Sequence, residues 1–402
     1  MRILIYGINY SPELTSTGKY TGEMGSWFAD QGHEVRVVTA PPYYPAWRID
    51  RRYRNRFARN VEDGVQVIRC PLYVPRRPSA FSRLLHLASF SISSALPLLS
   101  SLIWKPDIVI QIVPTLICSL QTLALAKLSG AKSVIHIQDY EVDAMFGLTL
   151  VENKSLHRFA LWIERLILKR FDLVSTISER MIERAVEKGV QPDKLILFPN
   201  WSDIQRYSGV EKDERLLSEL GIDFKKKNVL YSGNLGEKQG LELVIEVAKS
   251  MKLVNEIHFL MVGDGAAKAM LEKLTKSYSL ENVTFLPLQS SQRFPRLLAS
   301  VDCHLVVQKY GVADAVLPSK LTNILAIGGN AVISAEKSTS LGSLCSRYKG
   351  VAVLVEPESA SALEDGIVKA LEMPQPNEVA RQYARDHLDM KVILSRYLHA
   401  IS

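Results

Sequence analysis

The sequence has few cysteines, and they are not arranged to bind a metal or to build a disulfide framework. The four are Cys70, Cys118, Cys303 and Cys345, far apart and each in or beside an apolar segment. Such spacing is typical of buried thiols in a reducing compartment. We therefore expect a cytoplasmic protein without a cysteine-based metal site.

Targeting signals and disordered stretches are scarce as well. The first ten residues, MRILIYGINY, hold one basic residue and an apolar run that ends before Gly7, which is too short for a signal peptide. Pro-rich, Ser-rich and like-charged stretches are short, so we expect no disordered region. The net charge of +7 favours anionic partners, whether nucleotide, phospholipid or nucleic acid.

A dinucleotide-binding fingerprint is also missing. The loop after the first apolar run reads YGINYSPELTSTG and lacks the GxGxxG spacing, and no acidic residue ends the next run, EVRVVT. NAD sites of the Rossmann type use the glycines for the pyrophosphate and the carboxylate for a ribose. An NAD-dependent dehydrogenase is therefore disfavoured.

One long stretch, residues 84–104, has no formal charge and reads LLHLASFSISSALPLLSSLIW. It reaches the length of a membrane span, but its serines, His86 and the central Pro97 count against one. Cations flank the stretch, with Arg76, Arg77 and Arg83 before it and Lys105 after it. We expect a buried or interfacial helix rather than a span.

Apolar runs of strand length alternate with helical patterns along the whole chain. The runs in the first half are RILIY, EVRVVT, VQVIRC, DIVIQI, KSVIHI, DLVST and KLILF, and a second series starts at NVLYSG. This order is typical of α/β folds with doubly wound parallel sheets. We predict two Rossmann-like domains, 1–205 and 206–375, with helices in 376–402 that cross back to the first.

The loops after strands carry the candidate binding residues, because open parallel sheets bind ligands beyond the carboxyl ends of their strands. Glycines let the backbone approach a ligand, and helix N-termini attract phosphate. On these grounds the candidates are Gly18, Gly233, Gly236, Lys238, Gly263 and Asp264. Plainer interpretations stay open, with Asp264 as the cap of the next helix and Lys238 as a solvated charge.

The stretch DAVLPSKLTNILAIGG predicts a short helix with a polar start. Ser319 follows a proline at the helix start, and Gly328 ends the helix. Lys320 and Asn323 lie three residues apart and therefore on one side of it. They suit a pyrophosphate and a ribose hydroxyl, although an ordinary amphipathic helix would show the same pattern.

Polar residues also end the run KSVIHI, where Gln138, Asp139, Glu141 and Asp143 follow His136. A carboxylate at the end of a strand suits a general base that takes a proton from a hydroxyl. We favour Asp139 over Glu141 for this role. His136 belongs either to this cluster or to the core, since it alternates with isoleucines.

Taken in order, these motifs resemble the retaining GT-B glycosyltransferases of family four. The matching segments are YSPELTSTGKYTGEM, GHEV, TAPPYYPAW, HIQDYEVDA, STISERM, FPNWSD, SGNLGEKQGLE, VGDG and LPSKLTNILAIGG. Within the family the chain is similar to the branch for colanic acid and related exopolysaccharides, whose colanic acid member is assigned as a fucosyltransferase.

This resemblance implies two Rossmann-like domains that face a central cleft and transfer a sugar with retention. The C-terminal half would bind a nucleotide-sugar, with GDP favoured over UDP, and the N-terminal half a polyprenyl-diphosphate-linked glycan. Neither metal nor other cofactor is implied, and no nucleic acid. Peripheral binding to the inner face of the plasma membrane would then involve residues 84–104 and the nearby arginines.

The resemblance also assigns roles, with departures. Asp139 takes the position of an acceptor-side base, and Gly18 lies in a loop that faces the donor phosphates. Asn234 stands where the family has an arginine, which shifts the stabilisation of the diphosphate to Lys238, Lys320 and the amides near Ser319. Asn323 and Ala315 replace two glutamates, and Asp314 is the nearest substitute for the second.

Because the sequence departs from the family pattern at these positions, two other functions stay open. One is a nucleotide-sugar epimerase of the same architecture, which would need no lipid-facing helix. The other is a catalytically silent, membrane-associated partner of a polysaccharide assembly complex.

Overall fold

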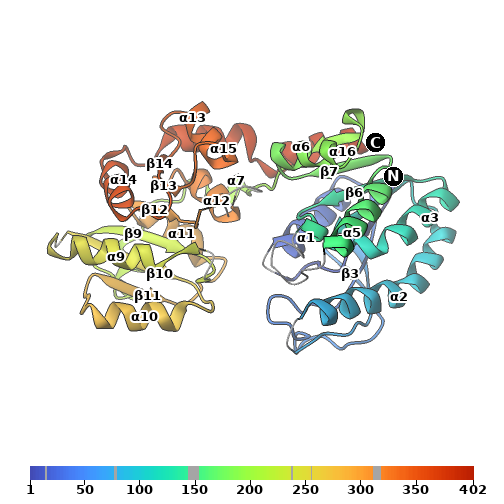
Figure 1. The fold of residues 1–402 in the computed structure, drawn as a ribbon, viewed down its shortest axis with the longest axis horizontal. Coiled ribbons are helices and arrows are strands. Elements are labelled where there is room, and N and C mark those ends of the chain that lie inside the picture. The colour runs from blue at the N-terminus through green and yellow to red at the C-terminus, as the bar shows by residue number, and fades with distance from the viewer. Residues whose placement is uncertain (14–15, 77–78, 144–153, 237–238, 255, 311–317) are drawn as a thin grey trace. The chain divides into compact units, whose positions relative to one another are not determined.

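The computed structural model describes residues 1–402 except 14–15, 77–78, 144–153, 237–238, 255 and 311–317. The chain forms two compact units (Figure 1). Unit 1 comprises Met1–Pro199 and Leu394–Ser402, and unit 2 comprises Asn200–Ile393.

Unit 1 is built on an eight-stranded sheet with the order β3-β4-β2-β1-β5-β6-β7-β8. Its strands are β1 (Arg2–Tyr6), β2 (Glu34–Thr39), β3 (Ala58–Glu62), β4 (Val65–Arg69), β5 (Ile108–Val113), β6 (Lys132–Ile137), β7 (Leu173–Thr176) and β8 (Leu195–Leu197). All neighbours pair in parallel except β3 with β4. The central strands are buried along almost their whole length, as expected for a sheet covered on both faces.

Helices cover both faces of this sheet. They are α1 (Ser16–Asp30), α2 (Ala80–Trp104), η1 (Leu116–Cys118), α3 (Ser119–Ser129), α5 (Lys154–Leu168), α6 (Glu179–Glu187), η2 (Pro192–Lys194) and α16 (Met390–Ile401). The connections β4 to β5, β5 to β6 and β6 to β7 all advance in one direction across the sheet. Right-handed crossovers therefore place α2, α3 and α5 on one face and α1 on the other.

The uncharged run forms α2, which starts at a capping box made by Ser79 and Ser82. One row of the helix, His86, Phe90, Ser94 and Leu98, is buried. The hydroxyls of Ser94 and Tyr6 are hydrogen-bonded at 2.6 Å, which ties this row to β1. Among the described residues, one helical segment, Phe81–Trp104, is both long enough and apolar enough to cross a membrane. Two of its buried serines nevertheless contact the sheet, since Ser94 bonds Tyr6 of β1 and Ser101 accepts a hydrogen bond from Arg36 of β2.

Unit 2 has a six-stranded sheet with the order β11-β10-β9-β12-β13-β14, parallel throughout. The strands are β9 (Lys227–Ser232), β10 (Ile257–Val262), β11 (Val283–Leu286), β12 (Cys303–Val306), β13 (Ala331–Ser334) and β14 (Val353–Val355). One apolar core includes Leu230 and Leu325, and the other includes Val229 and Phe259. Because Val229 and Leu230 are successive residues of β9, the two cores lie on opposite faces of the sheet.

The helices of unit 2 are α7 (Ile204–Tyr207), α8 (Glu214–Glu219), α9 (Glu242–Ser250), η4 (Met251–Leu253), α10 (Lys268–Ser277), α11 (Arg293–Ser300), α12 (Ser319–Ile327), α13 (Ser340–Arg347), α14 (Ala360–Glu372) and α15 (Glu378–His387). α15 packs on α12, where Arg381 donates a hydrogen bond to the carbonyl of Ile327 at 3.1 Å. The last nine residues, in α16, return to unit 1. There Tyr397 stacks on Phe198 at 3.6 Å between ring centroids and contacts the Ser175 hydroxyl at 3.1 Å.

Candidate functional site

The loops after β9 and β10 pack directly on each other in unit 2. The amide of Gly233 donates to the carbonyl of Val262 at 2.9 Å, and the amide of Leu235 donates to the carbonyl of Asp264 at the same distance. Gly263 has φ +151°, and a Cβ there would lie 1.9 Å from the carbonyl oxygen of Gly233. The VGDG motif therefore needs its first glycine so that two backbones can meet.

The predicted cap is wrong for Asp264. Helix α10 begins at Lys268 and its N-cap is Ala267, with no side-chain capping bond. Asp264 instead accepts a hydrogen bond from the amide of Gly265 at 2.9 Å. The two glycines that flank Asp264 extend the loop, so the helix starts too late for this side chain to cap it.

The start of α12 brings a lysine to the glycine loop after β9. Lys320 Nζ lies 3.0 Å from the hydroxyl oxygen of Tyr231 and 4.1 Å from the centre of its ring. A Cβ on Gly233 would lie 3.7 Å from the same nitrogen. Tyr231 in turn donates to the carbonyl of Asn234 at 2.8 Å. Three predicted residues, Gly233, Asn234 and Lys320, are therefore gathered around a tyrosine that the sequence reasoning had not singled out.

The charge of Lys320 is poorly solvated in this position. Burial lowers its pKa from the usual range to about 8. In the part of the chain that the structure describes, its polar partner is a hydroxyl and not a carboxylate. A half-buried cation of this kind, beside a helix N-terminus with its own positive pole, favours an anion such as a phosphate.

Asn323 lies one turn further along α12 and is held by a neighbour. Its Oδ1 accepts a hydrogen bond from the Ser202 hydroxyl at 3.2 Å, while Ser202 itself is buried. Ser319 is the first residue of α12, which ends at Gly328 in the left-handed conformation. The helix bounds thus follow the predicted start and stop signals.

Other predicted positions of this half are described less fully. Gly236 lies close to the side chains of Asn234 and Gln239, since a Cβ on it would fall within 2.9 Å of both. Lys238 lies outside the described residues, as do Asp314 and Ala315.

In unit 1, Gly18 belongs to the first turn of α1, and its missing side chain makes room for Glu13. A Cβ on Gly18 would lie 2.7 Å from the Cβ of Glu13. The buried Glu13 carboxylate accepts hydrogen bonds from the amides of Tyr43 and Tyr44, each at 3.0 Å, and from Asn9 at 2.8 Å. Burial raises the pKa of Glu13 in spite of these donors. Glu13 therefore clamps the loop after β1 to the loop after β2.

At the end of β6, His136 is a core residue. Its Nδ1 lies 3.0 Å from the Ser175 hydroxyl and its Nε2 lies 2.9 Å from Gln138 Nε2. Burial lowers the pKa of His136 to about 3, so the ring is neutral at physiological pH. The alternation with isoleucines had allowed this role.

The carboxylates that follow differ in their surroundings. Asp139 is an exposed residue just beyond the carboxyl end of β6. Glu141 is less exposed and accepts a hydrogen bond from the amide of Leu116 at 2.9 Å. Burial raises the pKa of Glu141. Of these two residues, Asp139 is the more exposed to solvent.

A buried lysine anchors the segment after Asp139. Lys188, the C-cap of α6, binds Glu164 of α5 and lies 3.1 Å from Asp143 Oδ1. Its ammonium also lies 4.8 Å from the centre of the Tyr140 ring. Although burial opposes it, hydrogen bonds from Arg184 and Lys188 lower the pKa of Asp143. Ion pairs thus connect the start of this segment to α5 and to the C-terminal end of α6.

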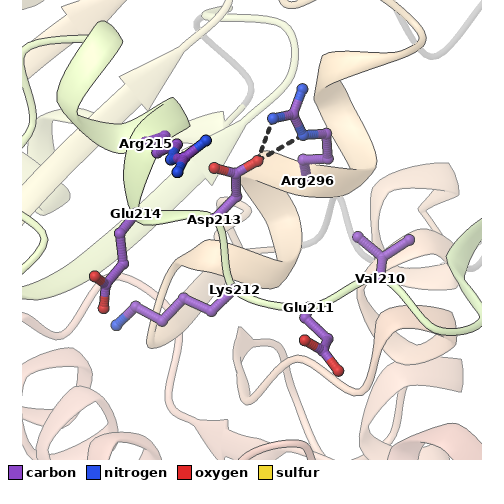
Figure 2. Close-up of a pocket in the computed structure, with 7 residues that line it drawn as sticks. All are labelled: Val210, Glu211, Lys212, Asp213, Glu214, Arg215 and Arg296. Carbon is purple, nitrogen blue, oxygen red and sulfur yellow. Dashed lines mark hydrogen bonds and ion pairs between the residues drawn. The ribbon is translucent and has the colours of Figure 1, made fainter.

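Figure 2 shows a different pocket of unit 2, lined by residues 210–215 and Arg296. Asp213 and Arg296 point toward each other there and form an ion pair. Of the predicted site residues that the structure describes, none lines this pocket. Asp213 and Arg296 neutralise each other, and the predicted residues that the structure describes lie elsewhere, so this pocket is not the candidate site.

Comparisons with known proteins agree with the motifs. Residues 16–201 match the family described as glycosyl transferase 4-like domain, and residues 212–387 match glycosyl transferases group 1. The chain is 53% identical to the putative colanic acid biosynthesis glycosyl transferase WcaI of Escherichia coli (strain K12), over the full length of both.

Solved structures support the same fold. Sucrose-phosphate synthase from Thermosynechococcus elongatus matches with a TM-score of 0.76 and 15% identity, covering 100% of both chains. Anabaena HepE in complex with UDP-glucose matches with a TM-score of 0.70 and 16% identity, covering 100% of this chain and 99% of HepE. The predicted GT-B fold, with its two parallel sheets, is confirmed.

Proposed function

This chain belongs to the glycosyltransferases with a 4-like N-terminal domain and a group 1 C-terminal domain, and we propose that it makes an exopolysaccharide of the colanic acid type. In this proposal a nucleotide-sugar donates its sugar to a polyprenyl-diphosphate-linked glycan, with retention of the anomeric configuration. The 53% identity to WcaI supports the pathway.

The observation that carries the donor assignment is the position of Lys320. A departing nucleoside diphosphate carries negative charge that must be stabilised as the glycosidic bond breaks. Lys320 supplies a cation next to Gly233, and the N-terminus of α12 adds its positive pole. In this proposal Asn323, whose side-chain oxygen accepts a hydrogen bond from Ser202, binds a ribose hydroxyl of the donor.

For the acceptor we propose Asp139 as the base that takes the proton of the attacking hydroxyl. The exposure of Asp139 at the end of β6 supports this choice over Glu141, which accepts a hydrogen bond from the amide of Leu116. Gly18, in the first turn of α1, would approach the donor phosphates together with the loop that Glu13 holds. Because the proposed acceptor is linked to a membrane lipid, the enzyme would act at the inner face of the plasma membrane.

A thermal stability series tests the donor class first. A ligand that binds only the folded protein raises the melting temperature, so GDP, UDP, ADP and NAD are compared at equal concentration. We expect the largest rise with GDP. A larger rise with UDP would assign a UDP-sugar, and no rise with any nucleoside diphosphate in folded protein would overturn the donor site.

Transfer is then measured with labelled nucleotide-sugar and a polyprenyl-diphosphate-linked glycan. We expect Lys320→Ala to lower kcat/KM by about 100-fold or more, the loss typical of one stabilising donor. The exposed Lys276 of α10 provides the matched control, Lys276→Ala. Asp139→Asn should abolish transfer while the stabilisation by GDP persists. Turnover by Asp139→Asn at the wild-type rate would remove Asp139 from the mechanism. Conversion of the nucleotide-sugar into its epimer in the absence of acceptor, rather than its hydrolysis to nucleoside diphosphate, would instead indicate an epimerase.

A further inference from the structure

Ser202 lies in the connection that leads from unit 1 into unit 2. Unit 1 is interrupted after Pro199, unit 2 begins at Asn200, and Ser202 is fully buried. The backbone of Ser202 is held by the segment that leads back to unit 1. Its amide donates to the carbonyl of Leu388 at 2.8 Å, and its carbonyl accepts from the amide of Met390 at 3.2 Å. Two segments that are far apart in the sequence therefore fix the position of this serine.

The hydroxyl of Ser202 reaches the side chain of Asn323 on α12. It donates a hydrogen bond to Asn323 Oδ1 at 3.2 Å. Among the described residues, no second hydrogen bond holds the side chain of Asn323, which is partly exposed. Because the amide group is planar, a bond that fixes Oδ1 also fixes the direction of Nδ2. The buried serine thus determines what Asn323 presents to a ligand.

An amide held in this way presents a hydrogen-bond donor. Asparagine Nδ2 carries two N–H groups and accepts no hydrogen bond, while Oδ1 is already bonded to Ser202. A ligand group that meets Nδ2 must therefore contain an acceptor atom. A ribose hydroxyl contains one, because its oxygen has two lone pairs. The methylene group of a deoxyribose contains none.

The spacing of Lys320 and Asn323 agrees with the order of groups in a nucleoside diphosphate. Both residues belong to α12 and lie three positions apart, so their Cβ atoms are neighbours on one side of the helix, about 5–6 Å apart. In a nucleoside diphosphate the ribose is attached directly to the diphosphate. A diphosphate beside Lys320 therefore brings its ribose close to Asn323.

We infer that Ser202 is a positioning residue for the ribose of the donor, and that it makes the site select ribonucleotides over deoxyribonucleotides. This rests on the proposed nucleotide-sugar donor and names the group of that donor that Asn323 recognises. Ser202 is buried and does not touch the ligand. It holds the Asn323 amide with Nδ2 toward the ribose, so a residue of the connection between the units controls selectivity at α12.

Isothermal titration calorimetry with GDP, 2′-deoxy-GDP and 3′-deoxy-GDP tests the inference on the full chain. The corresponding UDP series replaces it if UDP is the stronger ligand. These ligands lack the transferred sugar, so they differ in the ribose alone. We expect the wild type to bind one of the deoxy ligands about tenfold more weakly than GDP, the loss of one hydrogen bond. Ser202→Ala should bind GDP about threefold to tenfold more weakly than the wild type. It should bind that deoxy ligand as the wild type does.

Two further variants separate positioning from a general loss of structure. Asn323→Ala should lose the same discrimination, and the addition of Ser202→Ala should then change the Kd for GDP by less than about twofold, because the serine acts through the asparagine. Ser300→Ala is the matched control. It also removes a buried hydroxyl from unit 2, one that accepts a hydrogen bond from the amide of Asp213, and should leave every Kd unchanged. Circular dichroism and the melting temperature verify that each variant is folded.

The inference is overturned if the wild type binds GDP and both deoxy ligands equally. It is also overturned if Ser202→Ala weakens all three ligands by the same factor, because the serine would then only support the fold. Additive losses in Ser202→Ala/Asn323→Ala have the same meaning. Each of these results leaves the proposed donor class standing, since GDP still binds. Absence of binding by GDP, UDP and ADP in folded protein would refute the proposed donor site together with the inference.

Discussion

The ammonium of Lys320 and the hydroxyl of Tyr231 lie 3.0 Å apart, with the ammonium also above the tyrosine ring. The face of the Tyr231 ring attracts the ammonium by a cation–π interaction, and the hydroxyl oxygen accepts a hydrogen bond that orients the ammonium. Because the hydroxyl also bonds the backbone of Asn234, one side chain orients both the cation and the glycine loop. Tyr231 is thus a positioning residue for the proposed diphosphate site.

Removal of this hydroxyl should impair catalysis without loss of the fold. Tyr231→Phe keeps the ring but loses the hydrogen bond to a charged group, so we expect kcat/KM for transfer to fall about tenfold. Tyr348→Phe is the control, since that hydroxyl contacts His387 elsewhere in unit 2. If both variants transfer sugar like the wild type, the Tyr231 hydroxyl has no positioning role.

Nucleoside diphosphate binding should depend on the protonation of Lys320. Its pKa near 8 means that the unbound protein loses this positive charge as the pH rises through 8. We expect the Kd for GDP to increase above pH 8, by at most about tenfold per pH unit. Isothermal titration calorimetry from pH 7 to about 9.5 measures this Kd. The range begins below the lowered pKa of Lys320 and stays below the ordinary lysine pKa.

The variant Lys320→Met shows whether that lysine is responsible. It should bind GDP weakly and show no change in Kd through this pH window. A wild-type Kd that stays flat from pH 7 to 9.5 would contradict the assignment.

The contact between the β9 and β10 loops should be intolerant of a side chain. In Gly263→Ala the new Cβ would meet the carbonyl oxygen of Gly233, so the loops must separate. We expect a loss of about 3 kcal/mol or more in the free energy of unfolding. Gly221→Ala is the control, because Gly221 has φ +72° but nothing within 4 Å of the added Cβ. That variant should lose only about 1–2 kcal/mol. Similar losses in urea unfolding would show that backbone conformation, rather than the loop contact, dominates at Gly263.

For the buried ion pair of Lys188 and Glu164, we predict that replacing both residues restores stability that is lost when Lys188 alone is replaced. Lys188→Met leaves the Glu164 carboxylate buried without its cation, and should cost about 3–5 kcal/mol in the free energy of unfolding. The double variant Lys188→Met/Glu164→Leu replaces both charges with apolar groups and should recover most of this loss. A double variant as unstable as the single one would mean that Lys188 stabilises chiefly through Asp143.

The strands were predictable because both sheets are buried on two faces. Runs such as RILIY and IHFLMV coincide with β1 and β10, since strands covered on both faces carry apolar residues at almost every position. The strand β3 was missed. Its residues, ARNVE, form the antiparallel edge and are largely exposed, so no apolar run marks them.

The candidate site was predictable only where a local pattern marks it. Lys320 follows a helix start signal, and Gly233 follows a strand. Tyr231 was missed because it sits inside an apolar strand and looks like a core residue. Glu13 was missed because its partners, the backbone amides of Tyr43 and Tyr44, are 30 and 31 residues away in the sequence and have no side-chain signature.

The return of α16 to unit 1 has a consequence for synthesis on the ribosome. Phe198 and Ser175 receive their partner Tyr397 only after unit 2 has been translated. Unit 2 is contiguous in the chain and can complete its sheet first, whereas the N-terminal unit waits for its last helix. A fragment that stops at Pro199 would therefore leave an aromatic surface uncovered, and the two halves of this enzyme cannot be separated by a single cut.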